Sequence, residues 1–103
     1  MAVFDAILVP AKLSGVRATL NTITATAAIT PGKGTIFAFS ADQVCSLTFG
    51  LAASLPDPTA TVGFQVPANS IVVFDLGSDK DSFKAFNQSG STANYSWMAL
   101  SKF

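Results

Sequence analysis

Apolar residues recur at every second position in short runs, and no other feature of this chain constrains its fold as strongly. In residues 16–21 (VRATLN) and 61–66 (TVGFQV), apolar side chains alternate with polar or small ones. A period of two is typical of a strand with one buried face. Turn-forming Gly, Pro, Asn and Asp separate the runs, which predict strands at 3–9, 16–24, 35–39, 44–49, 61–66, 71–76, 82–86 and 94–100. The pattern predicts an all-β fold, a β-sandwich or jelly roll of about eight short antiparallel strands.

The length of the chain limits it to one domain. A chain of 103 residues buries enough surface for one core, without disulfides or structural metal, and leaves no room for a second domain. We therefore expect a single β-sandwich over residues 1–103, in which residues 1–12 form an N-terminal arm or an edge strand. The candidates for a short helical turn are residues 41–42 and 51–54, and only the second is a candidate helix.

Residues 71–74 (IVVF) are apolar on both faces of the expected strand. A strand of this kind is either covered on both sides within the core or lies at an interface. We favour the first interpretation, a central core strand.

Charged side chains are scarce. They make up 12% of the residues, with six Lys and Arg against six acidic residues, whereas 50% are hydrophobic. The basic residues are scattered along the chain, and binding to nucleic acid needs clustered Lys and Arg that displace counterions. The sequence therefore argues against a nucleic-acid partner.

A surface with so few charges must be covered mainly by Ser, Thr, Ala and exposed apolar side chains. Such surfaces are commonly occupied by a partner, so we expect much of the outside to be buried against copies of the chain or against a large partner. The contact candidates lie in the first segment and in the loop after residue 50, and they are Val3, Phe4, Ile7, Leu8, Leu51 and Leu55. For each of these residues, a place in the ordinary core is the alternative.

Groups that perform acid–base or nucleophilic chemistry are few. Cys45 falls on the buried face of its expected strand, and the chain has no His to activate a thiol. Asp75, Asp79 and Asp81 cluster near Gly77, but a calcium loop usually adds a bidentate Glu, and this chain has none. We interpret the cluster as a solvated turn. The composition favours a structural or binding role over catalysis, with no cofactor and no bound metal.

Tyr95 and Trp97 fall on the same face of the last expected strand. They form either an aromatic row of the core or an exposed platform on which a sugar stacks. We favour the core row, because sugar sites usually add polar groups beside the ring.

The N-terminal residues 1–10 (MAVFDAILVP) lack the basic n-region of a signal peptide, and Asp5 interrupts their apolar stretch. No run in the sequence approaches the roughly 20 apolar residues of a membrane helix. We expect a protein without a membrane partner that is synthesised and folded in the cytoplasm.

The order of turns and strands along much of the chain resembles small β-sandwich accessory proteins in the virions of tailed bacteriophages. The resemblance covers roughly residues 29 to 100 and rests on ITPG (29–32), IFAFS (36–40), LTFG (47–50), FQVPANSIVVFDLG (64–77) and FNQSGSTA (86–93). It contains no catalytic signature.

The resemblance implies a capsid decoration, or cement, protein. A protein of this type sits outside the major capsid shell, stabilises it and is often a trimer, so the implied partners are the major capsid protein or other virion proteins. The alternatives are another virion component, such as a head fibre, neck or tail protein, and a small carbohydrate-binding module.

Overall fold

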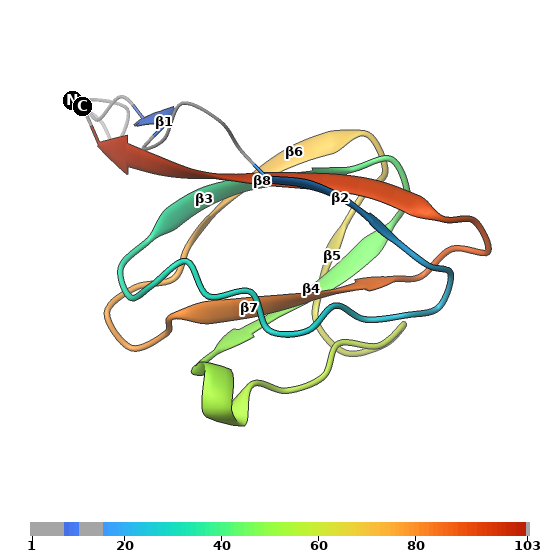
Figure 1. Ribbon diagram of the computed structural model, residues 1–103, viewed down its shortest axis with the longest axis horizontal. Helices are drawn as coiled ribbons and strands as arrows, with labels where there is room; N and C mark the ends of the chain where they lie inside the picture. The colour runs from blue at the N-terminus through green and yellow to red at the C-terminus, as the bar shows by residue number, and fades with distance from the viewer. Residues whose placement is uncertain (1–7, 11–15, 103) are drawn as a thin grey trace.

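The computed structural model describes residues 8–10 and 16–102, and these residues form two antiparallel β-sheets that face each other (Figure 1). The elements, in chain order, are β1 (Leu8–Pro10), β2 (Val16–Leu20), β3 (Ile36–Ala41), β4 (Cys45–Gly50), the 3-10 turn η2 (Ala52–Ser54), β5 (Phe64–Val66), β6 (Ser70–Asp75), β7 (Ser82–Asn87) and β8 (Ala93–Lys102). The prediction of an all-β sandwich of short antiparallel strands is confirmed, as is the helical turn after residue 50.

The five-stranded sheet is built around β8. This strand pairs with β3 along one edge and with β1 and β2, one after the other, along the opposite edge. β6 pairs with the far side of β3 and is the last strand of this sheet among the described residues. The interpretation of residues 71–74 as a central strand is therefore wrong, because β6 lies at a sheet edge.

The second sheet has the order β5-β4-β7. Residues 24–29 extend it beyond β7, where the amides of Thr26 and Ile29 donate to the carbonyls of Ala85 and Phe83 at 2.8 Å each. With this segment, the two layers read β2-β8-β3-β6 and 24–29-β7-β4-β5. Successive segments mostly cross between the layers, and this is the strand order of a jelly roll.

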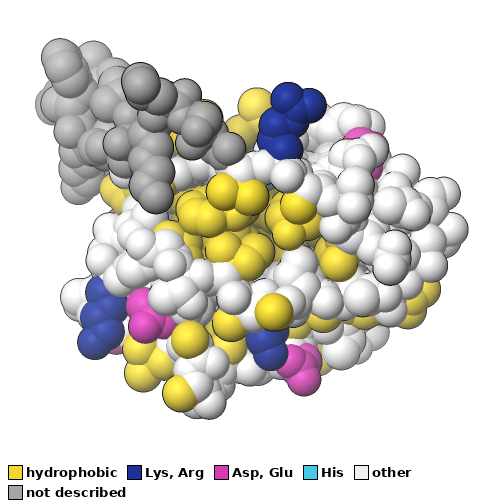
Figure 2. Space-filling model, in the orientation of Figure 1, with side chains coloured by type: hydrophobic (Ala, Val, Ile, Leu, Met, Phe, Trp, Pro, Cys, Tyr) yellow, Lys and Arg dark blue, Asp and Glu magenta, His cyan; other side chains and the backbone are white. Residues whose placement is uncertain are grey.

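The core lies between the two sheets, and its largest buried side chains are aromatic. Phe37 and Phe39 of β3 and Phe83 of β7 are fully buried, and the rings of Phe37 and Phe83 stack with centroids 4.5 Å apart. Buried aromatic rings bring the largest apolar area to a small core. Figure 2 shows hydrophobic side chains gathered between the two layers and only a few charged groups on this side of the molecule.

Gly63 explains why β5 is shorter than its alternating sequence suggests. Its φ of +120° suits only glycine, and a Cβ at this position would lie 2.8 Å from the carbonyl oxygen of Leu47. The chain bends here before it begins to pair with β4 at Phe64.

Candidate interaction surface

The outer face of the five-stranded sheet is the side that points away from the core. Phe37 and Phe39 of β3 point inward, so Ile36, Ala38 and Ser40 point outward. The register of the neighbouring strands completes this surface, which we call the bare face, with Ile71, Val73, Asp75, Ser96, Met98, Leu100 and Arg17.

Large aliphatic side chains on the bare face are strongly exposed. Ile71 is 75% exposed and Val73 is 48% exposed, and both lie on the edge strand β6. Between these side chains and Met98 the sheet carries only Ala38, Ser40 and Ser96, whose small side chains leave a shallow hollow of about 240 Å³. The bare face therefore combines projecting side chains with a depression.

Two opposite charges lie at opposite corners of the bare face. Arg17 on β2 is level with Ser96 and Ser40, whereas Asp75 on β6 is level with Ile36. Both side chains are exposed, and among the described residues no carboxylate lies within ion-pair distance of the Arg17 guanidinium. A third charge, Asp42, lies beyond the end of β3, where its carboxylate accepts hydrogen bonds from the backbone and side-chain amides of Asn94.

The outer face of the three-stranded sheet is covered by the chain itself. Residues 51–62 run beneath β4 and β7 (Figure 1), where the Thr48 hydroxyl donates to the Pro56 carbonyl at 2.6 Å and the Lys84 ammonium pairs with Asp57 at 2.6 Å. Thr48 is consequently only 7% exposed, and Pro58 is fully buried. We call this surface the covered face.

The structure separates the predicted contact residues. Val3, Phe4 and Ile7 lie outside the described residues, and Leu8 pairs with Lys102 at the start of β1. Leu51 lies at the start of residues 51–62, which we call the covering segment. It is 42% exposed, so it is available to a partner. Leu55 is only 8% exposed, in line with the alternative of an ordinary core residue.

The bare face was not identified from the sequence as a contact surface. Ile36, Ala38 and Met98 alternate with buried residues in their strands, and that pattern alone does not show whether the second face is solvated or covered. The available signal was the doubly apolar run 71–74, for which an interface was the second interpretation.

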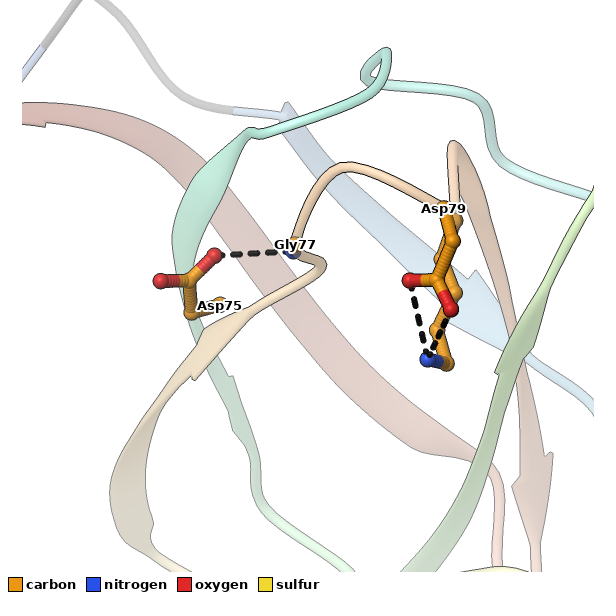
Figure 3. A network of polar contacts seen from close by, with 4 residues as sticks. Asp75, Gly77 and Asp79 are labelled. Atoms are coloured by element: carbon orange, nitrogen blue, oxygen red, sulfur yellow. Dashed lines mark hydrogen bonds and ion pairs between the residues drawn. The ribbon is translucent and has the colours of Figure 1, made fainter.

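The clustered carboxylates near Gly77 have separate hydrogen-bond partners (Figure 3). Asp75 accepts from the amide of Gly77 at 2.9 Å, and Asp79 accepts from the Lys80 ammonium at 3.2 Å. The hydrogen bond and charge of that ammonium lower the pKa of Asp79. Asp81 instead accepts from the Ala52 amide and the Ser82 hydroxyl. Within the described ranges, no three carboxylate or thiol groups converge in a way that suits a metal ion.

Tyr95 and Trp97 pack against the core. Tyr95 stacks on Phe39 with ring centroids 5.8 Å apart, and Trp97 meets Phe37 and Phe83 edge-on at 6.2 and 5.7 Å. Both side chains are partly buried against the core, in agreement with the favoured interpretation of a core row. A sugar-stacking platform loses its main support, because both ring systems are engaged with other aromatics.

Cys45 is fully buried on the inner side of β4, as its alternating sequence predicts. Burial, with a smaller contribution from the negative charge of Asp42, raises the pKa of its thiol to about 11. The thiol therefore stays protonated at neutral pH and is a poor nucleophile.

The described part of the chain contains no helix long and apolar enough to cross a membrane. No profile of a known protein family matches the chain, and no curated protein or solved structure is similar to it.

Proposed function

We propose that the protein is a non-enzymatic structural component of a bacteriophage virion, a capsid decoration protein that binds the outside of the major capsid shell and stabilises it. The observation that carries this proposal is the character of the surface. Seven large hydrophobic side chains are between 42% and 75% exposed, on a chain in which only 12% of residues are charged. Two of them, Ile71 and Val73, are neighbours on the same face of β6, and contiguous exposed apolar patches are typical of surfaces that a partner covers.

The jelly-roll strand order is in keeping with this role, since viral capsid proteins and lectins share it. Fold alone does not determine function, so the proposal also rests on the order of turns and strands that resembles virion accessory proteins. A lectin-like function has less support, because Tyr95 and Trp97 are engaged in the core.

Leu51 is the residue through which we propose contact with the shell. It is exposed at the start of the covering segment, next to η2, and no side chain of the described residues shields it fully. Several weak contacts of this kind gain affinity when copies of the protein bind neighbouring capsomers together. The protein would be made in the host cytoplasm and reside on the exterior of the virion.

The experiment that tests this proposal is co-sedimentation of the purified full chain with phage heads. The heads are assembled, without this protein, from the major capsid protein encoded in the same genome. We expect saturable pelleting with the heads and a higher temperature of head disruption. Leu51→Asp should weaken pelleting about tenfold or more, whereas Lys33→Asp, at an exposed turn, should not. Failure of the native chain to pellet at any concentration would overturn the proposal.

A further inference from the structure

The two charges on the bare face are placed so that the face is complementary to itself. Arg17 and Asp75 lie three strands apart across the sheet, and the register sets them four residues apart along the strands. With strands about 4.8 Å apart and a rise of about 3.4 Å per residue, each of these offsets is about 14 Å. The two residues therefore occupy diagonal corners of an approximately square patch.

A twofold axis in the plane of this patch, along the other diagonal, exchanges the two corners. It brings Arg17 of each copy opposite Asp75 of the other, so that one operation forms two ion pairs. Because this axis runs at about 45° to the strands, the sheets of the two copies cross at about 90°. Orthogonal crossing is one of the two arrangements in which β-sheets pack face to face.

The same operation also matches the shape of the face. It places Val73 of each copy over Ser40 and Ser96 of the other copy, where the small side chains leave the hollow. Ile71, which is 75% exposed, lies close to the axis and meets its own counterpart. The same rotation therefore brings projecting side chains over recessed positions and places opposite charges against each other.

We propose that the bare face binds the bare face of a second copy of this chain, in a twofold dimer held by Arg17–Asp75 pairs around an apolar centre of Ile71 and Val73. The dimer leaves Leu51 exposed and is independent of binding to heads. It implies an even number of copies, in contrast to the trimer that the resemblance suggests.

The size of the patch sets the strength of the contact. A patch of about 20 Å by 20 Å on each copy would bury a total surface area of roughly 800 Å² in the dimer. This area is in the range of weak and reversible associations. We therefore expect dimer formation to become measurable at tens to hundreds of micromolar, as estimated from interfaces of this size.

Charge reversal at the two corners gives a sharp test. Arg17→Asp places two like-charged pairs in its own homodimer, and so does Asp75→Arg. The dissociation constant of each single variant should rise about tenfold or more in sedimentation velocity without added salt. An equimolar mixture of the two variants should dimerise again, since the mixed pair restores both attractive contacts, and the double variant should likewise form a homodimer.

Two control variants and one further disrupting variant separate this effect from misfolding and from general charge effects. Lys33→Asp makes the same change in net charge as Arg17→Asp, at an exposed turn outside the strands of the sheet, and should change the dissociation constant far less. Asp75→Asn keeps an acceptor for the Gly77 amide while removing the charge, and Ile71→Asp should abolish pairing. A native chain that is monomeric at 1 mM, on the scale expected for weak pairs, would overturn the proposal. So would a trimer, or a dimer that neither charge reversal affects, which would place the contact elsewhere, for example at the free edge of β6.

Discussion

The two sheets of this sandwich differ in their outer faces: one is covered by the chain itself, and the other is exposed. Thr48 and Ser46, on the covered face, are nearly buried although they point away from the core, whereas Ile71 and Val73, on the bare face, are apolar and exposed. The difference arises from the two long connections. Residues 24–29 extend the three-stranded sheet at its edge, and residues 51–62 lie over its outer face. No comparable segment of the described chain lies over the five-stranded sheet, and Ile71 and Val73 remain exposed there.

The largest contrast between accessible and enclosed positions should appear in thiol chemistry. At pH 8, a thiol with a pKa of about 11 has on the order of a hundredfold less thiolate than an ordinary exposed cysteine. Cys45 should therefore react with a thiol reagent at least about a hundredfold more slowly than Ile71→Cys in a Cys45→Ala background. The measurement is the rate of labelling of dilute, folded protein. Similar rates for the two thiols would show that Cys45 is not enclosed.

Leu55→Ala should destabilise the fold by about 2–3 kcal/mol, because it removes the side chain with which residues 51–62 are buried against the sheet. The matched variant Leu51→Ala, only four residues earlier, should cost less than about 1 kcal/mol, since this side chain is 42% exposed. Urea unfolding followed by tryptophan fluorescence measures both. Equal losses would contradict the distinction between a packed and an available leucine within this segment.

Thr48→Val should lower the free energy of unfolding by about 1–2 kcal/mol. The substitution keeps the shape of the side chain but leaves the Pro56 carbonyl without the hydroxyl that donates to it. Thr19→Val is the corresponding change on the exposed side of β2, and its effect should stay within about 0.5 kcal/mol. The same urea titrations compare them, and a larger effect at Thr19 would reverse the assignment of the two faces.

The smallest effect on stability is expected where apolar side chains are most exposed. Ile71→Thr and Val73→Thr keep β-branched side chains, and each should change the free energy of unfolding by less than about 0.5 kcal/mol in dilute solution. Binding of a hydrophobic fluorescent dye to the folded protein should nevertheless fall when both are present. A loss of stability as large as that of Leu55→Ala would mean that the bare face is already packed within one chain.

Most of the strands were predictable, because alternation of side chains is a local property. The runs at 36–41, 45–50 and 82–87 alternate between core and exterior within single stretches of sequence, and these strands appear within a residue or two of their expected bounds. β2 ends at Leu20, earlier than expected, and residues 24–29 cross to the other sheet. Small Thr and Ala residues dominate that segment, so its alternation gives little contrast between a buried and an exposed side.

The position of a strand within its sheet was not predictable in the same way. Residues 71–74 have the composition of a central strand, and β6 nevertheless lies at an edge, because its neighbours are set by contacts between distant segments. The bare face depends on that placement. The positions of Arg17 and Asp75 on the bare face were likewise not predictable. Arg17 is aligned with Ser40, and Asp75 with Ile36, only through the register of four strands, which no single run of sequence determines.

β8 pairs with β1, β2 and β3, although it is the last of the described strands in the chain. During translation, the first three strands leave the ribosome before the strand that joins them has been made. Until β8 is made, β1 and β2 lack this hydrogen-bond partner and β3 can pair only with β6. Pairing between distant segments is intrinsically slow and exposes chains to aggregation. Completion of the five-stranded sheet is thus coupled to the end of synthesis of β8, and a chain interrupted before residue 93 would present several strand edges to its neighbours at once.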